Sequence, residues 1–168
     1  MRNPANKMNV FVWSLLVVAA LVAAVWLAGR LGALRGRPPA TLGVHNGRLS
    51  GPSSTPNSVS SQAELHAGHP MLGYSRIAPL PAYGGGRATI ARVGEVIARM
   101  PGATVIEQRD DYLYAQFETP TLRFVDDVEF WYDPATSALQ VRSASRIGRR
   151  DFGVNRARIE AIRRQLQH

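Results

Sequence analysis

Asp126 is the residue whose type and setting best suit chemistry in this sequence. It is the one acidic residue on the apolar face of a predicted strand, and the residues expected opposite it, Ala115 and Ser145, have small side chains. A carboxylate in that position needs hydrogen bonds or a positive partner, because an unpaired buried charge is strongly unfavourable. The sequence therefore predicts a polar site on the inner side of a sheet.

Two interpretations of this site stay open. Either a ligand or partner group binds in a polar pocket around Asp126, or the carboxylate is a structural link between the sheet and the C-terminal segment. In the second case an arginine of the last helix or of the cap segment around residues 51–62 would neutralise it. The candidate binding residues are Asn57, Asp126, Ser143, Ser145, Arg146, Asp151, Asn155 and Arg156.

A hydrolytic enzyme is the alternative from another functional class, with Asp126 or Asp127 as general acid or base. The sequence offers no nucleophile, metal site or cofactor motif to accompany these carboxylates. His66 and His69 lack the third ligand that a metal site needs. The chain has no cysteine, which excludes a disulfide and a thiolate site. We expect no metal and no cofactor.

The opposite face of the same strands carries charged side chains. The members of this outer set are Asp127, Glu129, Arg142 and Arg146. Such a ladder is typical of a solvated face, where an exposed ion pair contributes about 0–1 kcal/mol. A second charged feature is the arginine-rich stretch 146–164. It either compensates the acidic strands or forms a basic surface for anionic lipid or for the acidic surface of a partner.

The elements that position these residues follow an apolar N-terminal run. Residues 10–28 carry no charge and extend about 28 Å as a helix, close to the hydrocarbon thickness of a bilayer. Trp13 and Trp26 lie near its ends, where indoles favour the membrane interface. A cleaved signal peptide has a shorter apolar region. We therefore predict a retained transmembrane helix after a basic tail at residues 1–9.

The net charge of +8 is concentrated around this run. Residues 1–50 hold six basic residues and no acidic residue. Residues 51–168 hold 14 arginines and all 12 acidic residues, so their charges nearly balance. A nucleic-acid-binding protein should carry its basic footprint on the folded domain, so we expect no nucleic-acid partner. The short basic tail before the apolar run resembles a signal-anchor, which favours a periplasmic domain on the bacterial inner membrane.

Residues 29–50 have the composition of a linker, and residues 51–168 are predicted to form one α+β domain. Apolar spacings of three and four predict a helix over 88–100, and Asn155 is a candidate N-cap for a last helix. Between them, alternating patterns predict three or four antiparallel strands at 104–109, 112–118, 122–132 and 138–147. The order is helix, β-meander, helix, with the helices on one face of the sheet.

Matching the apolar faces aligns the strands, because a slip of one residue would turn the core outward. When each turn is centred between its two strands, Asp126 lies opposite Ala115 in the preceding strand and opposite Ser145 in the following strand. The same register pairs Glu129 with Arg142 on the other face. Opposite charges then face each other across the strands, which favours this register.

Five segments together resemble one known family. They are residues 56–61, 111–115, 123–130, 141–146 and 151–156. Over about residues 50–167 the chain resembles the family called domain of unknown function 1499 (DUF1499). The resemblance implies a membrane-associated or exported bacterial domain and brings no established activity. The family's first motif often has cysteine where Ser58 stands, so a thiol role does not apply here.

The sequence thus predicts a membrane-anchored envelope protein with a non-catalytic domain that binds a ligand or partner. The bilayer itself is a partner through residues 10–28. The partner of the domain is an envelope protein or an anionic lipid, and a surface domain for anionic lipid is the second alternative.

Overall fold

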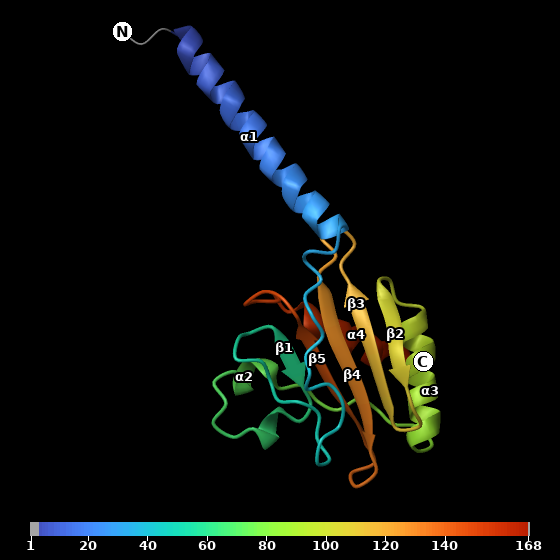
Figure 1. Cartoon of the computed structure of the whole chain (residues 1–168). Helices are drawn as coiled ribbons and strands as arrows, with labels where there is room; N and C mark the ends of the chain where they lie inside the picture. Colours follow the sequence, from blue (N-terminus) through green and yellow to red (C-terminus); the bar gives the residue numbers. More distant parts are fainter. Residues whose placement is uncertain (1–3, 168) are drawn as a thin grey trace.

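The computed structural model describes residues 4–167, so part of the predicted basic tail, residues 1–3, lies outside the described residues. A long helix, α1 (Pro4–Arg30), projects from a domain that begins soon after it (Figure 1). Within α1, the segment Asn9–Arg30 is apolar and long enough to cross a membrane. It is the one such helix in the part of the chain that the structure describes. The predicted span 10–28 falls inside it.

A five-stranded antiparallel sheet with the order β1-β5-β4-β3-β2 forms the centre of the domain. Its strands are β1 (Ser58–Ser60), β2 (Ala103–Gln108), β3 (Tyr112–Glu118), β4 (Val125–Asp133) and β5 (Ala138–Ser145). The predicted α+β class is confirmed. The prediction of three or four strands missed β1, because three residues are too few to show an alternating pattern.

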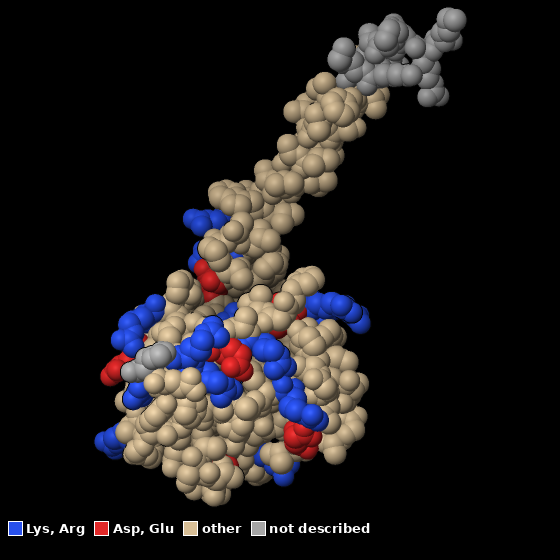
Figure 2. Space-filling view, turned by 180° about the vertical axis from the view of Figure 1, so that it is seen from behind, with Lys and Arg blue, Asp and Glu red and all other residues tan. Residues whose placement is uncertain are grey.

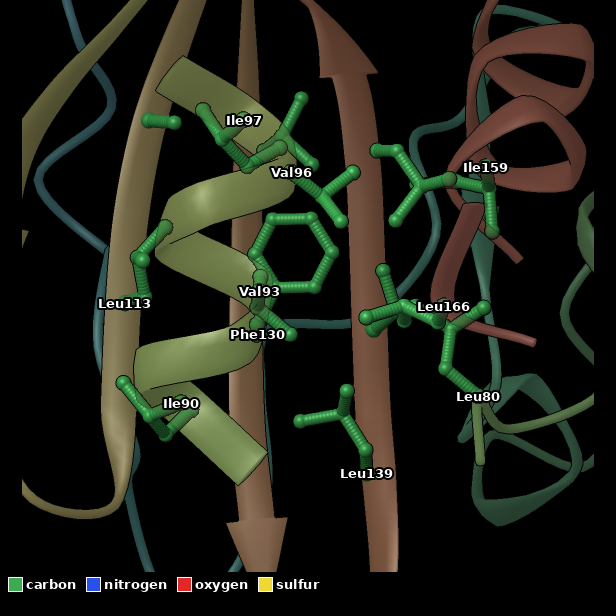
Figure 3. Packing of buried hydrophobic residues seen from close by; sticks show 14 of the residues in the cluster. Leu80, Ile90, Val93, Val96, Ile97, Leu113, Phe130, Leu139, Ile159 and Leu166 are labelled. Carbon is green, nitrogen blue, oxygen red and sulfur yellow. The ribbon is translucent and has the colours of Figure 1, made fainter. Parts of the chain in front are cut away.

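Two helices, α3 (Gly86–Ala98) and α4 (Val154–Leu166), cover one face of the sheet. Figure 3 shows their apolar side chains over those of β3, β4 and β5. Fully burying one such side chain stabilises the fold by about 1.5–3 kcal/mol. The shared core of α3, α4 and the sheet includes Ile90, Val93, Ile97, Leu113, Phe130, Leu139, Ile159, Ile162 and Leu166. Both helices were predicted from these spacings.

Short elements lie beside β1, at one edge of the sheet. They are one turn of 3-10 helix at Ala63–Leu65 and the short helix α2 (Leu72–Ser75). The residue after α2, Arg76, forms a bridge with Ser60 of β1, so this edge of the sheet is partly covered. The family-like segment at 56–61 therefore belongs to the sheet itself.

The register of β4 on its two neighbours decides where Asp126 lies. Between β4 and β5 the predicted register is confirmed, since Asp126 pairs with Ser145. Between β3 and β4 it is wrong by two residues, because Asp126 pairs with Phe117 and not with Ala115. An even shift keeps every side chain on its predicted face. Asp126 therefore still projects toward the helices.

The error of two residues comes from the loop between β3 and β4. Its residues form a compact turn in which the Phe124 and Thr119 main chains are hydrogen bonded over 2.9 Å. Arg123 adopts a left-handed conformation with φ of 58°, which closes this turn. Strand β4 consequently begins at Val125 and not at residue 122.

The second face of the sheet is buried, so the expectation of a solvated face is wrong. Part of the segment predicted as a linker lies across this face and excludes water from its charged side chains. Apolar side chains of this segment and of the sheet form a second hydrophobic cluster on this face. Its members are Leu42, Val44, Leu49, Tyr112, Tyr114 and Trp131. An irregular segment gives no periodic signal, so its packing could not be read from its sequence.

The end of α1 is fixed to the loop between β3 and β4. A Cβ atom at Gly29 would lie 2.8 Å from the main-chain oxygen of Leu122, so glycine permits this close approach. Glu118 accepts hydrogen bonds from Arg35, just after α1, and from Arg123 at 2.7 Å. The domain therefore contacts α1 directly and does not hang on a free tether.

Candidate functional site

A polar network lies between the sheet and the start of α4, and we call it the inner network. Its members are Asn57, Asp126, Ser143, Ser145, Asp151, Asn155 and Arg158. At its centre the Arg158 guanidinium donates to Asp126 at 2.5 Å. The side chains of Arg158 and Asp126 are 9% and 8% exposed, so the ion pair is closed to solvent.

Asn155 joins the strands to the helix within this network. Its side-chain nitrogen donates to the Asn57 carbonyl oxygen and to Ser145, each at 3.0 Å. Its side-chain oxygen accepts hydrogen bonds from Ser143 at 2.5 Å and from Arg158 at 2.8 Å. One fully buried amide therefore connects the residue before β1, strand β5 and α4.

Asn155 is not the N-cap that the sequence predicted. Gly153 occupies the N-cap position with φ of 84°, and Asn155 lies inside the helix. The capping bonds come from Asp151, whose carboxylate accepts the amides of Gly153 at 3.0 Å and of Asn155 at 3.1 Å. A carboxylate at a helix N-terminus is also favoured by the helix dipole.

The pKa of Asp151 reflects two opposing effects. Burial alone would raise the pKa of this carboxyl, but hydrogen bonds from Tyr74, Gly153 and Asn155 outweigh burial and lower the pKa. Burial and the neighbouring Asp151 raise the pKa of Tyr74, which donates its hydroxyl to that carboxylate. Asp151 is therefore held as an anion and is a poor general acid at neutral pH.

This lowered pKa predicts a pH dependence of stability. A carboxyl with a lower pKa in the native state stabilises the fold above its unfolded-state value, and that contribution is lost as the pH falls through the native pKa. We expect Asp151→Asn to lower the free energy of unfolding at neutral pH. The difference from the native chain should shrink toward zero below about pH 4.

Urea unfolding of the full chain in detergent at a series of pH values would measure this difference. A difference that stays constant from neutral to acid pH would show that the Asp151 charge does not stabilise the native state.

Two predicted site residues do not join the inner network. Arg146 lies on the other face of the sheet, where its guanidinium binds Asp127 through two hydrogen bonds of 2.6 and 2.8 Å. Arg156 donates to the main-chain oxygens of Tyr74 and Arg76, at 2.6 and 2.8 Å, and fixes α2 against α4. The remaining six predicted residues lie together.

Sequence reasoning did not single out Arg158, although an arginine of the last helix was one expected partner of Asp126. Arg158 follows Asn155 by three residues, so both side chains project from one side of α4. Its guanidinium also lies 4.7 Å from the centre of the Phe117 ring, a cation–π contact. Helical spacing from Asn155 was the signal that could have identified it.

A second polar network, the outer network, lies on the other face of the sheet. Its members are Tyr112, Tyr114, Asp127, Glu129, Arg142 and Arg146. Asp127 accepts hydrogen bonds from Tyr114 at 2.5 Å and from Arg146. This bonding raises the pKa of Arg146, which stays positively charged.

Glu129 and Arg142 form the less complete pair of the outer network. Burial raises the pKa of Glu129 and lowers that of Arg142, against the attraction between the two charges. Tyr112 and the Gly43 amide donate to one Glu129 oxygen at 2.9 and 2.7 Å. The other oxygen lies 3.6 Å from Arg142 Nη1, and neither of these two atoms has a hydrogen-bond partner.

An open hollow of about 460 Å³ lies beside the inner network. Its walls are Pro56, Tyr74, Arg150, Phe152 and Gly153, and we call it the Tyr74–Phe152 hollow. Two aromatic rings and a proline ring make it largely apolar, and Arg150 brings a positive charge to its rim. This hollow could not be predicted from the sequence, because its walls come from three separate segments.

Comparison with protein families places these residues in a known group. Residues 48–166 match the family described as "Protein of unknown function (DUF1499)". The chain belongs to this family. No curated protein and no solved structure matches it. The DUF1499 match begins at the last part of the segment that packs on the second face and includes all residues of both networks.

Within the DUF1499 domain, the two networks have a common chemical character. Asp126 and Asp127 lie next to each other in β4, project to opposite faces, and each binds an arginine at 2.6 Å or less. A carboxylate held in this way is already bound to a cation and does not reach open solvent. The Tyr74–Phe152 hollow is an open surface next to the inner network.

Proposed function

We propose that this chain is a single-pass protein of the bacterial envelope, with its DUF1499 domain acting as a non-catalytic binding module at the membrane surface. The apolar α1 helix supports the anchor. The short basic tail before the apolar run, which resembles a signal-anchor, favours a domain on the periplasmic side of the inner membrane.

The connection between Asp151 and the Tyr74–Phe152 hollow is the observation that carries the binding function. The Asp151 amide donates to the Pro56 carbonyl at 3.2 Å, and its carboxylate accepts hydrogen bonds from Tyr74 and Gly153. Asp151 therefore fixes three of the five walls of the hollow. Such a preformed hollow binds a ligand without first having to order its own walls.

The walls define the chemistry of the ligand. Tyr74, Phe152 and Pro56 offer apolar surfaces, and the Arg150 guanidinium at the rim suits an anionic group. The hollow therefore favours a ligand or partner group with an apolar body and a negative end. In this proposal the inner network is the frame of the site, and Asp126 acts through that frame without contacting the ligand.

A hydrolytic role for Asp126 or Asp127 has less support. Both carboxylates are bound to buried arginines, and general acid–base catalysis needs a group within hydrogen-bond reach of the substrate. A nucleic-acid partner is also disfavoured, because residues 51–168 hold nearly as many acidic as basic residues.

Photo-crosslinking in membranes tests the binding function with the full chain. The crosslinking amino acid p-benzoylphenylalanine would replace Phe152 at the hollow, or Ala135 in the exposed turn between β4 and β5 as a matched control. We expect protein or lipid adducts at position 152 and none at 135. The added substitution Arg150→Gln should reduce the adducts at 152 severalfold.

Absence of adducts at 152, or the same adducts at both positions, would contradict a binding site at the hollow. A melting temperature like that of the native chain would confirm that each variant is folded.

A further inference from the structure

The end of the sheet nearest α1 contacts the apolar part of that helix. Thr121 and Leu122, in the loop between β3 and β4, line an apolar recess together with residues of the predicted span. The α1 residues of this recess are Leu21, Val22, Val25 and Trp26. With α1 in a bilayer, the tip of this loop therefore lies at the depth of the helix end.

A second loop, residues 146–153, lies at the same end of the sheet. It follows β5, and a Cβ atom at Gly36 would lie 3.0 Å from side-chain atoms of Arg146 and Ile147. Gly36 is six residues beyond the end of α1. The start of this loop is therefore held near the plane at which α1 enters the domain.

The exposed tip of this second loop combines aromatic, aliphatic and basic side chains. Phe152 is 93% exposed and Ile147 is 40% exposed, and Val154, the first residue of α4, is 48% exposed. Arg149 and Arg150 are also exposed, and within residues 4–167 neither forms an ion pair. Seen from behind in Figure 2, basic side chains are spread over the face of the domain and reach the end that carries α1.

The main chain holds Phe152 in this exposed position. Phe152 has φ of 53° and the next residue, Gly153, has φ of 84°. A left-handed conformation is rare for a bulky residue and persists where its surroundings impose it. Here the Asp151 carboxylate binds the Gly153 amide at 3.0 Å. The loop is therefore built to present an aromatic ring outward.

We propose that the partner of this loop is the anionic phospholipid of the bilayer that α1 spans, with Phe152 inserted at the interface and Arg149 and Arg150 on lipid phosphates. This inference rests on the proposed function and names the ligand of the Tyr74–Phe152 hollow. An acyl chain supplies the apolar body that the hollow suits, and the headgroup phosphate supplies the negative end. Aromatic and basic residues together are typical of membrane-interface contacts.

A position next to the membrane makes lipid a better candidate than a soluble protein partner. Phe152 and the loop tip at Leu122 lie at one end of the sheet, and Leu122 already contacts the predicted span. Each basic residue near an anionic surface strengthens the attraction to it. A soluble partner would have to bind this loop in the narrow space between domain and bilayer.

Single-cysteine labelling tests this inference cleanly, because the chain has no cysteine of its own. An environment-sensitive dye is attached at F152C, or at A135C as a control at the far end of the domain. The full chain is reconstituted into vesicles of neutral lipid or of a neutral and anionic mixture, with a quencher on the lipid headgroup. We expect a blue shift and quenching at position 152 in anionic vesicles, and neither at 135.

The charge requirement is tested with two double variants. R149Q/R150Q should abolish most of the quenching at 152. R87Q/R109Q removes the same charge at the far end of the domain, where both arginines belong to exposed ion pairs, and should leave quenching unchanged.

The outcomes separate this inference from the proposed function. The dye at 152 could stay in water in both kinds of vesicle while the crosslinking experiment gives protein adducts at 152. That result would overturn lipid as the ligand and would still support the domain as a binding module. Quenching that is equal at 152 and 135, or equal with both double variants, would also overturn it. No adducts and no quenching at 152 would overturn both proposals.

Discussion

Replacing Asp126 with alanine should lower the free energy of unfolding by about 3–5 kcal/mol, because it leaves the buried Arg158 guanidinium without its anionic partner. The loss is large because the ion pair is closed to solvent and lies between the sheet and α4. Urea unfolding of the full chain in detergent, followed by circular dichroism, would measure it.

The double variant Asp126→Ala/Arg158→Met is the matched control. It removes both charges and fills the space with an apolar side chain, so much of the stability should return. Asp126→Ala with nearly native stability but without adducts at position 152 would contradict the structural role. In that case Asp126 would itself belong to the binding site, as the first interpretation of the sequence held.

The second large effect is expected at Asn155. Asn155→Ala removes a fully buried amide that binds Asn57, β5 and Asp151. Each buried polar group left without a partner costs about 1–3 kcal/mol, so the total loss should be about 3 kcal/mol or more. The melting temperature and the urea midpoint of the full chain would report it.

Gln165→Ala is the control on the same helix. It also replaces a side-chain amide with alanine, but Gln165 is exposed. A substitution at such a surface position changes stability by about 0.5 kcal/mol or less. An Asn155→Ala loss no larger than that of Gln165→Ala would show that the inner network does not hold α4 to the sheet.

Side-chain periodicity made most of the fold predictable. The bounds of β3 are those predicted, and the predicted spacing of apolar residues located α3 and α4 within two residues at their starts. The register of β4 on β5 was predicted because a short turn joins them. The register of β3 on β4 was not predicted, because Arg123 closes the loop between them in a left-handed conformation that the local sequence does not indicate.

The candidate site was predictable where residues follow the strand pattern and not where irregular segments meet. Asp126 and Ser145 were found from their alternation, and the covering segment at residues 42–49 was not. That segment buries Glu129 completely, although the sequence placed this residue on a solvated face. Contacts of this kind depend on tertiary packing and leave no periodic trace in the sequence.

The contact between Gly29 and Leu122 has a consequence for how the protein meets other molecules. A domain fixed at the end of its anchor has no reach beyond its own height, and it cannot sweep the space around it as a tethered domain would. With α1 as the membrane anchor that we propose, encounters depend on lateral diffusion within the plane of the membrane. Lengthening the chain between Gly29 and Gly36 would release the domain and let it sample the volume around its anchor.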